Sequence, residues 1–176
     1  GYIIVFQDVR GRYKSEGEFV QIRPLNKNKK GKKDKKNIDE ATDTYDTIEW
    51  LIHHTHSNER VGTWGISYDG FYATMSASCN HPALKAVSPQ APVTDWFRGD
   101  DRHHNGAFTF LQTTNFLPAL EGRNIEKGVM RQIVKNDVYS DCLALGTFKN
   151  ADDLVRDTPE TKWYNIKNHP NLHELC

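Results

Sequence analysis

The sequence predicts an α/β fold in which helices flank a parallel sheet. Short apolar runs rich in β-branched residues alternate with stretches whose apolar residues recur every three or four positions. The order strand, helix, strand, helix, strand favours a parallel layer with right-handed connections. After Pro92 the pattern changes, because aromatic residues and histidines accumulate without strand alternation. We therefore expect a partial sheet-and-helix core over residues 1–95 and part of a helical cap over residues 96–176.

The first expected strand covers residues 2–7, whose β-branched and aromatic side chains suit a strand buried on both faces. The chain opens on this pattern at Gly1, without a Met, so we interpret the sequence as an internal piece of a longer protein. A glycine-containing loop follows, in which Asp8 and Arg10 are expected to form an ion pair.

Residues 26–36 contain seven lysines and almost no apolar side chain. Such a segment buries too little surface to offset its ordering entropy, so we expect a solvated excursion. The rival interpretation is a patch that binds anions or nucleic acid. It is disfavoured because the segment lacks aromatic residues for base stacking and because 23 basic residues balance 23 acidic ones over the chain. Neither nucleic acid nor a membrane is an expected partner.

The remaining elements of the core follow in order. Residues 39–56 carry apolar side chains at helical spacing, with acidic residues on the other face and in the first turn. A buried strand is expected over 60–66, a helix over 68–79 and a third strand over 84–88. The sequence therefore predicts that strands and helices alternate throughout the core.

Cofactor and membrane chemistry find little support in the residue pattern. The three cysteines, Cys79, Cys142 and Cys176, lie far apart without a paired spacing, so free thiols are expected rather than a zinc site or a disulfide framework. No stretch of about 18 apolar residues is present, and no signal peptide is recognised. We expect no cofactor and no metal.

A serine lies between the second expected strand and the second expected helix. Ser67 has Gly65 two residues before it and Gly70 three residues after it. This pattern indicates a nucleophile elbow, a sharp turn that projects the serine hydroxyl above the sheet and requires small neighbours. The general motif has its second glycine two residues after the serine, where this chain has Asp69. The Tyr68 N–H, at the start of the helix, is a candidate oxyanion donor.

Several separated motifs go beyond a generic elbow. Gly65–Gly70 resembles the Gly-x-Ser-Tyr-x-Gly signature of the Xaa-Pro dipeptidyl-peptidase and cocaine-esterase superfamily. Phe6–Gly11, with the Ser15-Glu16-Gly17 triplet, is similar to the loop that precedes the elbow unit in that superfamily. His81–Ala86 and Trp96–Phe108 are most similar to α-amino acid ester hydrolases and glutaryl cephalosporin acylases.

The resemblance implies a partial α/β-hydrolase core followed by part of a helical cap, with a jelly-roll domain further on. It implies that Ser67 is the catalytic nucleophile and that Tyr68 is the backbone oxyanion donor. Asp101 matches one member of an acidic cluster that holds the α-ammonium group of the substrate. The family's triad aspartate and histidine, and its tyrosine hydroxyl donor, are expected outside this chain. Relatives of this type are often exported, so a periplasmic or extracellular location is an expectation.

Simpler interpretations stand beside these assignments. Asp101 is also placed to cap a helix, which general N-cap preferences favour. Asp100, Asp101, His103 and His104 resemble a metal cluster, but adjacent histidines on a helix point in different directions. The tryptophans, Trp50 and Trp64 among them, are expected to pack in the core.

The sequence thus predicts a serine hydrolase that forms an acyl-enzyme on Ser67. The expected substrates are esters or amides of α-amino acids, β-lactam side chains or N-terminal dipeptides, and self-association is left open. The alternative is a catalytically incomplete fragment or binding module, because a serine without its general base is a weak nucleophile.

Overall fold

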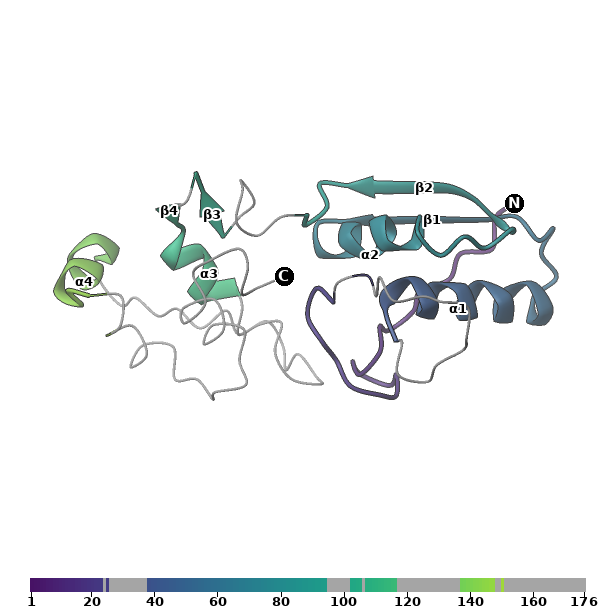
Figure 1. Cartoon of the computed structure of the whole chain (residues 1–176), viewed down its shortest axis with the longest axis horizontal. Coiled ribbons are helices and arrows are strands. Elements are labelled where there is room, and N and C mark those ends of the chain that lie inside the picture. Colours follow the sequence, from purple (N-terminus) through teal and green to yellow (C-terminus); the bar gives the residue numbers. More distant parts are fainter. Residues whose placement is uncertain are drawn as a thin grey trace. The chain divides into compact units, whose positions relative to one another are not determined.

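The computed structural model describes residues 1–23, 25, 38–94, 102–105, 107–116, 137–147 and 150. The chain divides into two compact units (Figure 1). The first unit consists of residues 1–11 and 15–94, and the second of residues 12–14 and 95–176. Each unit is described by itself. The assignment of residues 1–95 to a hydrolase core and 96–176 to a cap stays a prediction.

Helix α1 spans Glu40–His54, within the predicted range. Asp39 begins it with a reciprocal cap, since its carboxylate accepts the Thr42 N–H at 2.8 Å and its own N–H donates to Thr42 Oγ1 at 3.0 Å. The helix ends at Thr55, whose backbone is extended. The predicted helix and its acidic first turn are therefore confirmed.

Two parallel strands and an intervening helix complete the first unit. Strand β1 spans Val61–Ile66, helix α2 spans Tyr68–Ser76 and strand β2 spans Leu84–Gln90. The strands pair in parallel, with Gly62 opposite Ala86 and Ile66 opposite Gln90. The predicted strand, helix, strand order is confirmed, and β2 runs two residues further than expected.

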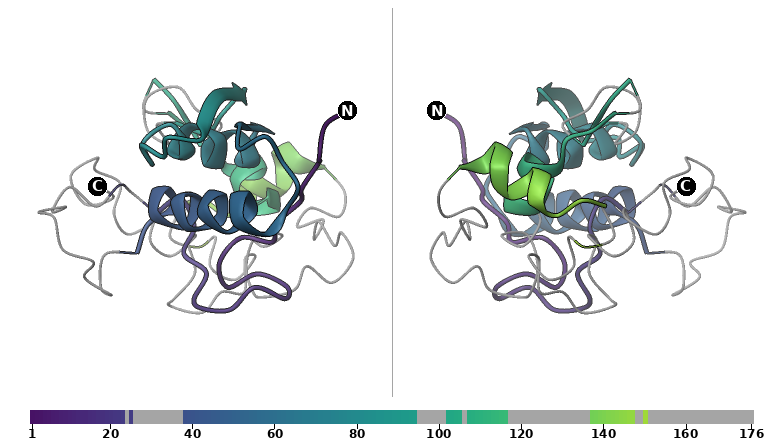
Figure 2. Two further views of the ribbon diagram at one scale, coloured as in Figure 1. Left: turned by 90° about the vertical axis from the view of Figure 1, so that its right-hand side faces the viewer. Right: turned by 90° about the vertical axis from the view of Figure 1, so that its left-hand side faces the viewer.

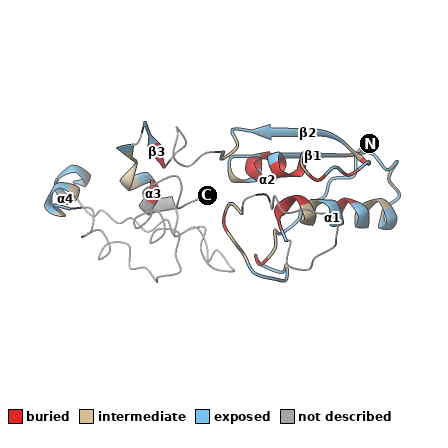
Figure 3. Ribbon diagram, viewed as in Figure 1, coloured by how far each residue is buried: buried red, intermediate tan, exposed pale blue. Residues whose placement is uncertain are grey.

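Both helices lie on the same side of the β1–β2 sheet (Figures 1 and 2). Most buried residues of the first unit lie on α1, on α2 and on the segment after α2, whereas β1 and β2 are largely exposed (Figure 3). A small cluster of buried residues joins α1 to the segment between α2 and β2; its members are Ala41, Ile48, Cys79 and Ala83. Val61 of β1 and Leu84 of β2 pack against this cluster, which therefore joins α1 to the start of both strands.

A buried histidine reinforces this contact between α1 and the start of β2. The His81 side chain is fully buried, and its Nε2 lies 2.8 Å from Glu49 Oε2. Its Nδ1 accepts the Ala83 N–H at 3.0 Å, so the ring proton is on Nε2 and is donated to the Glu49 carboxylate. His81 is thus a core residue with a structural role.

The far face of the sheet differs from the sequence prediction. Residues 60–66 were expected to be buried, yet Trp64 is 63% exposed and Ile66 is 52% exposed. Trp50, on α1, is also exposed at 56%, so core packing is wrong for both of these tryptophans in the described structure. For β1 the reason is that α1 and α2 lie on one face of the sheet and no described helix or strand lies on the other. Trp50, on α1, stacks on the ring of His54 instead.

The predicted first strand is also absent from the described structure. Residues 2–7 have no strand assignment, and Tyr2 and Phe6 are 99% and 85% exposed. An extended run becomes a strand only when a neighbouring strand shares its hydrogen bonds. Strand β1 pairs with β2 alone, and the run at 2–7 has no such neighbour among the described residues.

The expected ion pair between Asp8 and Arg10 is wrong as well. The Arg10 guanidinium binds Asp43 of α1 instead, through Nε at 2.7 Å and Nη2 at 2.5 Å. Two parallel hydrogen bonds to one carboxylate match the planar fork of arginine better than a single contact two residues away. This pair anchors the loop after the first apolar run to α1.

The described elements of the second unit are short. Strands β3 (His103–His104) and β4 (Ala107–Phe108) form an antiparallel hairpin, which the sequence did not predict. Helices α3 (Phe110–Phe116) and α4 (Val138–Ala144) follow. Helix α4 begins at Asp137, whose carboxylate accepts the N–H groups of Tyr139 and Ser140. No helix in the described ranges is both long and apolar enough to span a membrane.

Candidate active site

Ser67 occupies the turn between β1 and α2 in a backbone conformation that serine rarely adopts. Its φ is 60° and its ψ is −117°. A side chain in this region is strained, and such strain concentrates at functional sites. Although Ser67 precedes the first residue of α2, its hydroxyl makes no capping hydrogen bond. The residue is exposed, so the hydroxyl is accessible for chemistry.

Gly65 makes the sharp turn sterically possible. A Cβ at Gly65 would lie 2.2 Å from the carbonyl oxygen of Asp69, a backbone atom of the following helix. Real Cβ contacts are never this short, so a larger residue would force the strand and the helix apart. The sequence-based interpretation of Gly65 as a required small neighbour of Ser67 is therefore supported by geometry.

The backbone of Ser67 is tied to both following elements. Its N–H donates to the carbonyl oxygen of Gln90, the last residue of β2, at 2.9 Å. Its carbonyl oxygen accepts the N–H of Phe71 at 3.2 Å, which is the first hydrogen bond of α2. The same oxygen accepts the N–H of Val93 at 3.4 Å. These contacts hold the elbow at the carboxyl ends of both strands, where ligands of parallel α/β sheets bind.

Tyr68 is the first residue of α2. The N–H groups of a helix's first turn have no acceptor within the helix and lie at the positive end of its dipole. The Tyr68 ring packs near Tyr72, with centroids 5.6 Å apart, and edge-on to Phe71 at 6.5 Å. Burial, with Tyr68 nearby, raises the pKa of the Tyr72 hydroxyl. This aromatic group fixes the start of the helix under Ser67.

The described residues do not supply a general base to Ser67. The Ser67 hydroxyl makes no hydrogen bond to a histidine or carboxylate in the described ranges. His81 is engaged by Glu49, and His53 and His54 bond back to carbonyl groups of α1. Among the described residues, Ser67 therefore lies at the sharp turn before α2 without a hydrogen-bonded base.

The third predicted site residue, Asp101, lies outside the described residues. Of the neighbouring histidines, His103 is buried, with its ring centroid 5.1 Å from that of Phe108, and His104 is exposed. Their side chains lie on opposite faces of β3, as alternation along a strand requires. No group of three or more metal-ligating side chains converges among the described residues.

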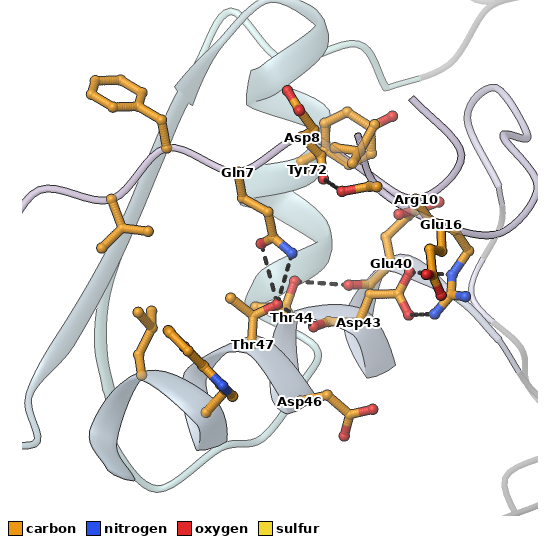
Figure 4. Close-up of a pocket in the computed structure, with 16 residues that line it drawn as sticks. Gln7, Asp8, Arg10, Glu16, Glu40, Asp43, Thr44, Asp46, Thr47 and Tyr72 are labelled. Atoms are coloured by element: carbon orange, nitrogen blue, oxygen red, sulfur yellow. Dashed lines mark hydrogen bonds and ion pairs between the residues drawn. The ribbon is translucent and has the colours of Figure 1, made fainter. Parts of the chain in front are cut away.

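A cavity of about 590 Å³ lies in the first unit between the N-terminal segment and α1 (Figure 4). Neither Ser67 nor Tyr68 lines it. Its described lining has one basic residue, Arg10, and five carboxylates, which are Asp8, Glu16, Glu40, Asp43 and Asp46. Burial raises the pKa of the Glu40 carboxyl, and Arg23, 4.0 Å away, opposes that shift. The sequence shows the three-residue spacing of Glu40, Asp43 and Asp46, but from this spacing we predicted only the acidic face of a helix.

A strained serine at a strand-to-helix turn, on a parallel sheet with flanking helices, defines a core of the α/β-hydrolase type. The comparisons with known proteins agree with this class. The sequence profile of the X-Pro dipeptidyl-peptidase (S15 family) matches residues 1–171, and the chain belongs to that family.

Individual relatives extend this result. The chain is 32% identical over 98 residues to the cocaine esterase of Rhodococcus sp. (strain MB1 Bresler), a match that covers 56% of this chain and 14% of the relative. A solved α-amino acid ester hydrolase superposes with a TM-score of 0.78 at 36% identity, over 97% of this chain and 27% of that one. An aminopeptidase from a marine sediment archaeon, Thaumarchaeota archaeon, also gives 0.78, at 35% identity over 93% of this chain and 26% of that one. The chain therefore spans about a quarter of the length of these solved relatives.

Proposed function

We propose that this chain is the nucleophile-bearing part of a serine hydrolase that forms an acyl-enzyme on Ser67. One observation carries the proposal: an exposed serine is held at φ 60° and ψ −117° between a parallel strand and a helix, with its hydroxyl outside any capping bond. Membership of the X-Pro dipeptidyl-peptidase family and the likeness to an ester hydrolase support it.

The proposed reaction is acyl transfer. A histidine acting as general base takes the proton of the Ser67 hydroxyl, and the oxygen attacks an ester or amide carbonyl carbon. The Tyr68 N–H donates to the oxyanion that develops on the carbonyl oxygen. Collapse of this intermediate expels the alcohol or amine, and water then releases the acid and restores Ser67.

The Ser67→Ala substitution tests the nucleophile. In the intact protein it should lower kcat for p-nitrophenyl esters by at least about 10⁴-fold, because a triad acts as a unit and only oxyanion binding remains. Ser88→Ala is the matched control, since Ser88 is an exposed serine on the neighbouring strand β2. An Ser67→Ala enzyme that keeps most of its turnover rules out the proposed role.

For the substrate we propose a compound with a free α-amino group, namely an ester or amide of an α-amino acid, a β-lactam side chain or an N-terminal dipeptide. The support is the match of Asp101 to the ammonium-binding place, together with likeness to an amino acid ester hydrolase and an aminopeptidase. Asp101→Asn should lower kcat/KM for an α-amino ester by roughly 10- to 100-fold, the usual loss of a hydrogen bond to a charged group.

The N-acetylated form of the same ester separates ammonium recognition from a structural role of Asp101. It carries no positive charge, so its kcat/KM should be the same for wild type and Asp101→Asn. An equal loss on both substrates would favour the helix-cap interpretation.

A second candidate state is a catalytically incomplete chain. The observation that favours it is that the Ser67 hydroxyl has no histidine partner among the described residues, and an unactivated serine reacts slowly. A fluorophosphonate probe labels only activated serines. It should label the intact protein and leave the 176-residue chain unmodified; labelling of the chain itself would reject this alternative.

A further inference from the structure

We propose that the turn formed by Gln90–Val93 is a positioning element for the Ser67 nucleophile, and that Gly70 is a glycine because this turn packs against it. The inference rests on the proposed function, since it gives Ser67 its chemical role. It assigns a task to residues that lie 23 or more positions after the serine and outside the glycine-flanked motif.

The turn contacts both polar groups of the Ser67 backbone. The Ser67 N–H donates to the Gln90 carbonyl oxygen at 2.9 Å, and the Val93 N–H donates to the Ser67 carbonyl oxygen at 3.4 Å. One short segment therefore forms a hydrogen bond with the Ser67 backbone on each side of the Cα atom. A strained conformation persists only where its surroundings fix it, and these two bonds supply that constraint.

The packing of the turn explains the displaced glycine of the motif. A Cβ at Gly70 would lie 2.7 Å from the Gln90 carbonyl oxygen and 2.9 Å from Pro92 Cα, both of them backbone atoms of the turn. Asp69, in the usual place of the second glycine, is exposed and has room for a side chain. Glycine is thus required at position 70, where the turn packs against the helix, rather than at position 69, where the general motif has its second glycine.

The turn itself has little conformational freedom. Ala91 has a φ of 41°, in the left-handed region that favours glycine, and Pro92 has a ring that fixes its own φ. A rigid segment that holds Ser67 by two backbone bonds transmits any displacement to the serine oxygen. A shift of about 1 Å in a reacting atom costs about 100-fold in rate.

The first test compares two glycine substitutions in the intact protein. Gly70→Ala should lower kcat, and the second-order rate of fluorophosphonate inactivation, by about 100-fold while KM stays unchanged. Gly62→Ala, in β1, is the control, because its Cβ would meet the Ala86 carbonyl oxygen at an ordinary 3.6 Å. Inactivation is measured well below the Tm of each variant, so that loss of folded protein does not contribute.

The second test removes one hydrogen bond between the turn and Ser67. Val93→Pro replaces the N–H that donates to Ser67 with a ring methylene, whereas Val93→Ala retains the N–H. The rate of inactivation of Val93→Pro should be lower than that of Val93→Ala by about tenfold, the usual worth of one hydrogen bond. If Gly70→Ala does not fold, this pair alone decides.

Two results separate the inference from the proposed function. If Ser67→Ala abolishes turnover while Gly70→Ala and Val93→Pro react at wild-type rates, the positioning role is wrong and the nucleophile assignment stands. If Ser67→Ala retains turnover, the proposed function fails first. If Gly70→Ala and Val93→Pro are both inactivated more slowly than wild type, with KM unchanged and Ser67 essential, the positioning role is supported.

Discussion

Residues 2–6 and residues 61–66 are both short apolar runs, yet only the second forms a strand in the described structure. The difference lies in their partners. Strand β1 is paired with β2, backed by α2 and bounded by a glycine-dependent turn, whereas Tyr2 and Phe6 are almost fully exposed. An apolar β-branched run therefore forms a buried strand only where neighbouring segments pair with its edges and cover its faces.

The largest expected effect comes from the turn that distinguishes the two runs. Gly65→Ala places a Cβ 2.2 Å from the Asp69 carbonyl oxygen, so we expect a loss of about 3 kcal/mol or more in the free energy of unfolding, measured by urea denaturation. Gly1→Ala is the counterpart beside the first run, where a Cβ meets nothing within 4 Å. Equal stability of the two variants would contradict the comparison.

The same isoleucine truncation in two places gives the next largest effect. Ile48 is 2% exposed and belongs to the core cluster, so Ile48→Ala should cost about 2–4 kcal/mol. Ile4 is 69% exposed, and Ile4→Ala should change stability by less than about 0.5 kcal/mol. A cost at Ile4 that approaches the cost at Ile48 would show that the first run is packed.

A smaller effect is expected where the loop after the first run is anchored. Arg10→Lys keeps the positive charge but loses the two-pronged contact with Asp43, so it should cost about 1 kcal/mol and speed proteolysis within residues 8–17. Arg60→Lys is the control, because Arg60 is exposed and has no ion-pair partner in the described ranges. Unchanged proteolysis of the Arg10 variant would mean that the pair does not hold the loop.

The smallest effect concerns Glu40, where α1 meets the acidic cavity. Burial raises the pKa of Glu40 in the folded chain, so its contribution to stability is present below the ordinary glutamate pKa and is lost as pH rises through the raised value. Glu40→Gln should therefore have a slightly higher Tm than wild type at neutral pH.

The Glu40 difference should vanish below about pH 4, where the wild-type carboxyl is protonated in both states. Glu59→Gln, at an exposed position, controls for the change in net charge. A Glu40→Gln variant that is less stable than wild type at neutral pH would show that the Arg23 contact outweighs burial.

The sequence predicted the features that depend on local chemistry. Helix α1 follows from its periodicity and its acidic first turn, and the sharp turn at Ser67 follows from Gly65 and Ser67 between a strand and a helix. These features involve residues within a few positions of one another, so a single sequence contains the whole signal.

The features that the sequence did not predict depend on distant partners. Arg10 pairs with Asp43, 33 positions away, rather than with nearby Asp8. The prediction that residues 2–7 and 60–66 are buried was wrong, because burial requires other segments to cover them. The hydrogen bonds between Ser67 and the turn at Gln90–Val93 join residues that are 23 or more positions apart. No local pattern encodes such contacts, and Asp101 remains a prediction.

The most direct test of the central claim is the site of covalent modification in the intact protein. After reaction with a fluorophosphonate, peptide mass spectrometry should place one adduct on Ser67, and Ser67→Ala should abolish it. An adduct on another serine, or unchanged labelling of the Ser67→Ala protein, would contradict the account of this turn as the nucleophile elbow.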